Sequence, residues 1–285
     1  MRRYFEIIKP KIVLGNLISS VCGLLIAEEY SFNFFRGFYV ILSIFLIISS
    51  CFILNNFMDR KVDKIMIRTK NRILTKDSSK NNIFFLILSF SFLIIGLLIL
   101  YKSSNLLSLS ISIFGFSTYI LYTVLKKKTF YSIYLGSLSG STPSIIAYCS
   151  ISNRIDVRSI IIYITLFLWQ IPHFYSISLL FLKDYLRAKI PILPNKIGLF
   201  KTKIHIFSYV MVFSILSMIP FFNGYVGVRY LNTTIFVNLI WLLTVLQGVI
   251  DSSVSLKKWS KKSFMISIIS INLFNCMFAI DKNLN

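Results

Sequence analysis

The sequence predicts an all-α, polytopic membrane protein with nine transmembrane helices. Of its 285 residues 56% are hydrophobic and only 14% are charged, whereas an ordinary soluble domain has about 25% charged residues. Apolar stretches of about 20 residues recur along the whole chain, and each could cross about 30 Å of hydrocarbon. Lys and Arg gather in alternate segments between these stretches. This pattern excludes a soluble globular domain and a disordered chain.

The expected spans are the nine apolar stretches. Five Ser and Thr residues make the fifth stretch the least apolar, so we expect it to face protein or a cavity rather than lipid. No loop is long enough to fold alone, and we therefore expect one integral-membrane domain over residues 1–285. The spans are residues 12–27, 38–58, 83–101, 105–122, 131–150, 159–180, 204–222, 230–250 and 264–280.

The distribution of basic residues predicts the orientation of the spans. The formal net charge is +21, from 31 Lys and Arg against 10 Asp and Glu. The N-terminal tail and four alternate loops (59–82, 123–130, 181–203 and 251–263) hold 25 of the 31. Because cytoplasmic loops are enriched in Lys and Arg, we expect a cytoplasmic N-terminus and an external C-terminus. The excess charge follows from this topology, and binding of nucleic acid is not needed to explain it.

Two acidic residues and an amide follow one another at helical spacing where the second span meets the cytoplasm. Asn55, Asp59 and Asp63 are four residues apart, so on a helix they share one face and lie about 6 Å apart along its axis. Two carboxylates at this spacing repel each other, and a divalent cation would reverse that effect. Mg²⁺ binds through one or two carboxylates and keeps positions for phosphate oxygens. Arg68 and Arg72 follow directly and suit the remaining phosphate charge.

Spacing alone fits a second interpretation equally well. In that interpretation the motif is a solvated helix end, and its acids simply pair with Arg60 and Lys64. The position of the motif favours the first interpretation, because a magnesium-bound diphosphate with a lipid tail would need its charge at the interface and its tail between helices.

Two further clusters occur in the basic loops. Asp184 stands beside Lys183 in the second long loop, which alone is typical of an ordinary juxtamembrane segment; facing the first loop, it would hold a second Mg²⁺. Lys126 and Lys127 belong to a run of three lysines that is either a topogenic anchor or a device for diphosphate capture.

A histidine lies inside the sixth span. Pro172 should kink this helix or free a carbonyl, and His173 follows it on the cytoplasmic side of mid-membrane. An ionisable residue at that depth is a functional candidate by default. A neutral histidine bonded to a carbonyl or to a serine is an equally good interpretation.

Taken together, these motifs resemble a known family. Residues 55–72 (NNFMDRKVDKIMIRTKNR) resemble the NxxxDxxxD signature of the UbiA-type intramembrane prenyltransferases. The leading NN and the closing RTKNR resemble the haem O synthase (protohaem IX farnesyltransferase) branch. Further matching segments are KPKIVLGNLIS (9–19), YTVLKKKT (122–129), Gly136 to Pro143, WQIPHF (169–174), KDYLRAKIPILP (183–194) and GLFKTK (198–203).

The resemblance implies a helical bundle in the bacterial inner membrane that transfers a farnesyl group from farnesyl diphosphate to a vinyl group of haem b. Mg²⁺ would be the cofactor and haem O the product, which a terminal oxidase or a haem A synthase would receive. The resemblance assigns the metal and catalytic roles to Asn55, Asp59, Asp63 and Asp184, diphosphate binding to Arg68, Arg72, Lys126, Lys127 and Lys183, and haem contact to His173.

Three positions depart from the family pattern. Ala188 stands where many prenyltransferases have a second acid, Ile171 replaces a common Pro, and Tyr148 replaces a common Trp. Three alternatives remain: a prenyltransferase for an aromatic or quinone-precursor acceptor, an ion-coupled transporter, and a non-catalytic haem-handling or oxidase assembly factor. The segment 169–194 argues against the first. The absence of acids inside the spans argues against the second, because transporters place carboxylates near the bilayer midplane.

Overall fold

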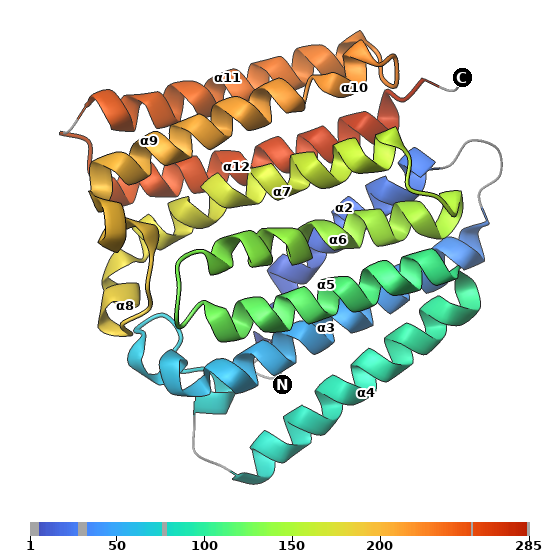
Figure 1. Cartoon of the computed structure of the whole chain (residues 1–285), viewed down its shortest axis with the longest axis horizontal. Helices are drawn as coiled ribbons and strands as arrows, with labels where there is room; N and C mark the ends of the chain where they lie inside the picture. Colours follow the sequence, from blue (N-terminus) through green and yellow to red (C-terminus); the bar gives the residue numbers. More distant parts are fainter. Residues whose placement is uncertain (1–5, 28–32, 76–78, 252, 284–285) are drawn as a thin grey trace. The chain divides into compact units, whose positions relative to one another are not determined.

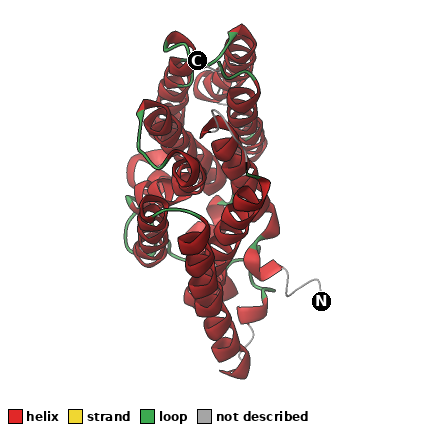
Figure 2. Cartoon of the chain, turned by 90° about the vertical axis from the view of Figure 1, so that its right-hand side faces the viewer, coloured by secondary structure: helices red, strands yellow, loops and turns green. Residues whose placement is uncertain are grey.

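The computed structural model describes residues 6–27, 33–75, 79–251 and 253–283, without the side chains of 79–81. These residues are almost entirely helical and contain no named strand (Figure 2). One isolated antiparallel bridge joins Val226 and Lys282. The predicted all-α class is therefore confirmed.

Nine long helices account for most of the described chain, and four short ones lie before or between them. The long helices are α2 (Pro10–Ala27), α3 (Phe34–Ile65), α4 (Ser79–Ser103), α5 (Leu106–Leu125), α6 (Ser132–Ser152), α7 (Val157–Leu180), α9 (Leu193–Leu216), α11 (Val228–Ile250) and α12 (Leu256–Ile280). The short ones are η1 (Glu6–Ile8), η2 (Ile73–Thr75), α8 (Leu182–Arg187) and α10 (Ile219–Phe222).

Eight segments of the described chain are long and apolar enough to cross a membrane, and α6 is not among them. The reason is the polar composition of α6, which corresponds to the fifth and least apolar of the predicted stretches. With 21 residues α6 still has the length of a span. Its Ser137, Ser139, Ser141, Thr142 and Ser144 are all buried, as expected for a helix that faces protein.

Three helices extend well beyond the apolar stretches that predicted them. Helix α3 continues to Ile65, α9 begins at Leu193 and α12 begins at Leu256. The added turns are rich in Lys, which is a good helix former, so the helices persist where hydrophobicity ends. Within α9, Gly198 has a φ of 82° and interrupts the helical backbone. Glycine populates this region without a steric cost.

The chain forms two compact units, and unit 1 comprises residues up to Arg154 together with Lys183–Ile190. In unit 1 the helices α2, α6, α5 and α3 pack each against the next and back to α2, and α4 packs on α3 (Figure 1). Two glycines allow close contact within this ring. A Cβ at Gly23 would lie 2.4 Å from the Ser144 carbonyl oxygen, and one at Gly115 would lie 2.3 Å from the Thr142 hydroxyl.

Unit 2 comprises Ile155–Leu182 and the chain from Pro191 onward. Its helices α7, α9, α11 and α12 also pack in a ring, each on the next (Figure 1). Aromatic side chains fill this unit: the Phe213 and Trp241 rings lie 5.6 Å apart, and Tyr230 packs on Phe274. We expected one domain over residues 1–285, which would include both units, and this expectation stays a prediction.

Candidate metal and diphosphate site

The NxxxDxxxD motif forms the last turns of α3 in unit 1. Asn55, Asp59 and Asp63 are 2%, 5% and 5% exposed, so these polar groups are not at a solvated helix end. Arg60, which that interpretation pairs with them, instead donates to the Phe57 carbonyl oxygen at 2.8 Å. Because an unpaired buried charge is costly, these carboxylates require cationic partners from elsewhere in the chain.

The cations come from two loops. Arg72 Nη1 donates to Asp63 Oδ2 at 2.8 Å. Lys126, at the end of α5, forms a short ion pair with Asp59 Oδ2. Lys127 Nζ lies 3.2 Å from Asp59 Oδ1 and also donates to the Met58 carbonyl oxygen at 2.7 Å. The structure thus brings five of the predicted charged residues together around one face of α3.

A fourth cation, Lys9, comes from a third segment, the N-terminal one, and the sequence analysis assigned it no role. Lys9 Nζ donates to Asn55 Oδ1 at 2.7 Å, and Asn55 Nδ2 donates to the Thr123 hydroxyl at 3.1 Å. Burial, together with the neighbouring Arg72 and Lys126 cations, lowers the pKa of Lys9 to about 7. The cluster therefore holds more positive charge than its two carboxylates balance, and an anion would be stabilised there.

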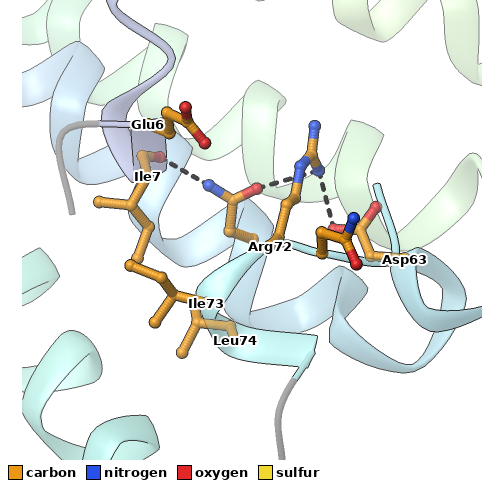
Figure 3. A pocket seen from close by; sticks show the side chains of 8 residues that line it. Glu6, Ile7, Asp63, Arg72, Ile73 and Leu74 are labelled. Carbon is orange, nitrogen blue, oxygen red and sulfur yellow. Dashed lines mark hydrogen bonds and ion pairs between the residues drawn. The ribbon is translucent and has the colours of Figure 1, made fainter. Parts of the chain in front are cut away.

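Asn56 connects the N-terminal segment to the loop after α3. Figure 3 labels Ile7 of that segment, and Arg72 and Asp63, around this connection. Its Nδ2 donates to the Ile7 carbonyl oxygen at 2.6 Å, and its Oδ1 accepts from Arg72 at 3.1 Å. Arg72 thereby contacts Asn56 and Asp63 at once. The small cavity around these groups has a volume of about 20 Å³, and Glu6 is also in its lining. Asn56 is a functional candidate that the repeated NN of the motif could have indicated.

The residues on this face of α3 fit a hard divalent cation. All three groups of the motif offer oxygen atoms, which Mg²⁺ prefers. Asp59 Oδ1 is buried and accepts no hydrogen bond in the described part of the chain. Among the described residues there is no group of three acids, His or Cys that could hold a metal. A pair of carboxylates suffices for Mg²⁺ when substrate phosphates supply the other ligands.

Asp184 has a different environment in this structure. Its carboxylate accepts hydrogen bonds from the backbone N–H groups of Ile67 and Arg68, at 3.1 and 3.2 Å. It thus holds the loop that follows α3, and it does not form a three-ligand group with Asp59 and Asp63. Lys183 is exposed. The roles of Asp184 in metal binding and of Lys183 in diphosphate binding stay predictions.

An apolar cavity of about 70 Å³ lies inside unit 1, between α2, α3, α5 and α6. Cys51 and Phe52, one helical turn before Asn55, are part of its lining. The Phe52 ring packs edge-on against Tyr119, which lines the same cavity. A hydrophobic space therefore begins about one turn from the charged cluster.

His173 belongs to unit 2 and lies on α7, which continues as a helix through Pro172. Its Nδ1 is 2.7 Å from the Ser267 hydroxyl. Trp169 stacks on its ring at a centroid distance of 4.7 Å. The serine-bonded histidine was one of the two interpretations that the sequence left open, and haem contact stays a prediction.

These observations define a helical membrane protein in which a buried, cation-surrounded pair of carboxylates adjoins an apolar cavity. The model of the UbiA prenyltransferase family matches residues 16–269. The chain belongs to this family, and it is an integral membrane prenyltransferase.

One sequence relative and two solved structures of the same fold are similar to this chain. A protoheme IX farnesyltransferase of Wigglesworthia glossinidia brevipalpis is 38% identical over 286 residues, which cover 99% of each chain. A structure of digeranylgeranylglyceryl phosphate synthase superposes with a TM-score of 0.80 at 17% identity, covering 98% of this chain and 97% of that chain. A UbiA homologue of Archaeoglobus fulgidus, bound to GPP and Mg²⁺, gives a TM-score of 0.70 at 13% identity, covering 97% and 99%.

Proposed function

We propose that this protein transfers the farnesyl group of farnesyl diphosphate to a vinyl carbon of haem b, and that water completes the hydroxyethyl group of haem O. The observation that carries the proposal is the buried pair Asp59 and Asp63 with its cations from three segments of the chain. The full-length similarity to a protoheme IX farnesyltransferase supports haem b as the acceptor.

The chemistry follows from what each group can do. The allylic C–O bond of farnesyl diphosphate breaks, and its electron pair leaves with the diphosphate. The vinyl π electrons then form the new C–C bond, and water adds to the resulting cation and loses a proton. Lys126, Lys127 and Arg72 would stabilise the charge that grows on the departing diphosphate. The apolar cavity next to Asn55 would exclude water from the farnesyl cation.

Mg²⁺ would neutralise phosphate charge as a Lewis acid, and we propose Asn55, Asp59 and Asp63 as its ligands. Lys9, Lys126 and Arg72 each contact one side-chain oxygen of Asn55, Asp59 and Asp63, respectively. These cations would move from those oxygens to the diphosphate when the substrate binds. The bound GPP and Mg²⁺ of the Archaeoglobus fulgidus homologue support a divalent cation in this fold.

The remaining assignments are part of the same proposal. Arg68 and Lys183 would add positive charge around the diphosphate, and His173 would contact haem b. Asp184 would bind a second Mg²⁺ only after exchanging its two backbone hydrogen bonds to residues 67 and 68.

For the location of the protein, we propose the bacterial inner membrane with the N-terminus and the charged cluster on the cytoplasmic side. The unequal distribution of the 31 basic residues supports this orientation. A terminal oxidase or a haem A synthase would receive the product.

A direct assay tests the proposal. The purified protein is incubated with haem b, farnesyl diphosphate and Mg²⁺, and the extracted haem is analysed by mass spectrometry. We expect a farnesylated, hydrated haem and one diphosphate released per product. The opposite result would be an unmodified haem together with prenylation of an aromatic acid or a quinone precursor under the same conditions. It would show that the acceptor is not haem b.

A further inference from the structure

We infer that Ser267 fixes His173 in the tautomer that carries its proton on Nδ1, so that Nε2 presents a lone pair to the iron of haem b. This inference rests on the proposed function, because it takes haem b as the ligand. It adds a positioning residue and assigns one ring atom of His173 to the iron.

The hydrogen bonds of Ser267 determine the direction of its bond to the histidine. A serine hydroxyl has one proton and two acceptor lone pairs. Ser267 donates this proton to the Phe264 carbonyl oxygen at 2.6 Å. The hydroxyl therefore accepts in its 2.7 Å bond with His173 Nδ1, and the histidine is the donor. A neutral imidazole has one N–H group, so the lone pair is on Nε2.

The same serine positions the ring. Trp169 Nε1 donates to the Ser267 carbonyl oxygen at 2.7 Å, and the Trp169 and His173 rings stack one helical turn apart on α7. The Phe264 ring lies 4.9 Å from the imidazole centroid. Ser267 is fully buried, so Trp169 and His173 of α7 both bond to one inaccessible residue of α12.

The edge of the imidazole opposite Nδ1 is not engaged. In the described part of the chain no hydrogen bond or ion pair involves His173 Nε2. A histidine that ligates a metal usually donates its other ring N–H to a protein acceptor, which sets its tautomer and orientation. His173 has this arrangement, with a hydroxyl as the acceptor. In ligation Nε2 would give its lone pair to the iron in place of a water molecule, and no proton would move.

The chain offers a matched control. Ser263 lies one turn before Ser267 on α12, is equally buried, and its hydroxyl interacts with Ser176 and Trp241 instead of the histidine. Replacing Ser263 by Ala therefore removes a comparable buried hydroxyl without touching His173. The chain contains only two histidines, so His205→Gln leaves a single imidazole for spectroscopy.

The first test measures the tautomer without any haem. In the full-length His205→Gln protein labelled with ¹⁵N-histidine, we expect the chemical shifts of the Nδ1–H tautomer. Ser267→Ala should shift the population toward Nε2–H, and Ser263→Ala should leave it unchanged. A predominant Nε2–H tautomer in the protein that retains Ser267 would overturn the inference.

The second test measures haem b binding by absorbance and resonance Raman spectroscopy, independently of farnesyl transfer. We expect an imidazole–iron signature that His173→Ala abolishes and that added imidazole restores. Ser267→Ala should weaken binding about 10- to 100-fold, as loss of such outer partners does at metal sites, and Ser267→Thr should retain it. An unchanged haem spectrum in His173→Ala with haem O still formed would overturn this inference alone, whereas a wild-type protein that neither binds nor modifies haem would overturn the proposed function.

Discussion

Replacing Asp59 by Asn should abolish most of the activity, because it removes the charge around which the site is built. Asp59 Oδ1 lies 3.2 Å from the Lys127 ammonium nitrogen. A unit charge pair at that distance interacts by about 5 kcal/mol at an effective dielectric constant of about 20. Desolvation offsets part of this energy, and removal of one partner of a buried pair costs about 3–5 kcal/mol.

The Lys127 side chain is 32% exposed and the Asp59 side chain 7%, so the lower end of this range applies. A cation held by Asp59 in the transition state would lose a similar amount, and about 3 kcal/mol corresponds to about 100-fold in rate. We therefore expect kcat/KM for farnesyl diphosphate to fall at least 100-fold in Asp59→Asn, measured as diphosphate release from protein in nanodiscs.

A charge-matched control separates this effect from a general loss of negative charge. Asp251, at the end of α11, interacts with Ser253, and Asp251→Asn should stay within threefold of wild type. Size-exclusion chromatography and thermal unfolding establish that both variants are folded. Activity of a folded Asp59→Asn protein within threefold of wild type would refute the metal and charge role of this residue.

Four further perturbations test other parts of the account. Arg72→Met should raise KM for farnesyl diphosphate about tenfold or more, since Arg72 contacts both Asp63 and Asn56; an unchanged KM would remove it from the diphosphate site. Arg36→Ala should lower the free energy of unfolding by about 2 kcal/mol, because the Arg36 side chain donates to two carbonyl oxygens near the ends of α4 and α6. It should leave kcat unchanged, and an unaltered unfolding temperature would contradict this prediction. Gly248→Ala should destabilise the folded protein by about 1–3 kcal/mol, because the added Cβ would clash with the Trp259 ring nitrogen. Thermal unfolding measures this effect. An unchanged unfolding temperature would show that α11 and α12 can move apart at little cost. Chelation of divalent cations should stop diphosphate release and added Mg²⁺ should restore it, whereas full activity in excess chelator would exclude the cofactor.

The length of the apolar stretches and the spacing of polar residues were sufficient to predict the spans and one face of the site. The spans were predictable because lipid-facing length and composition are local properties of the chain. The cluster of Asn55, Asp59 and Asp63 was predictable because four-residue spacing fixes a helical face. Helix ends were less predictable, as α9 shows: it begins eleven residues before its apolar stretch.

The cationic partners of Asn55, Asp59 and Asp63 could not be predicted from the sequence with equal certainty. Lys9 is separated from Asn55 by 46 residues, and only the packing of α2 against α3 brings them together. For Lys126 the sequence left two interpretations open, and its ion pair with Asp59 favours a role in the site. Asp184 is a different case. Its loop position alone is typical of an ordinary juxtamembrane segment, and its metal role is implied by the family resemblance. The sequence could not indicate that its carboxylate accepts hydrogen bonds from two backbone N–H groups.

The central claim is that Asp59 and Asp63 bind a divalent cation that also contacts the diphosphate. Mn²⁺ in place of Mg²⁺, together with a non-hydrolysable farnesyl thiodiphosphate, allows electron paramagnetic resonance of the bound metal. We predict bound Mn²⁺ with ³¹P coupling in the wild-type protein and free Mn²⁺ in the Asp59→Asn, Asp63→Asn double variant. Equal Mn²⁺ binding and equal ³¹P coupling in the folded double variant would contradict the account.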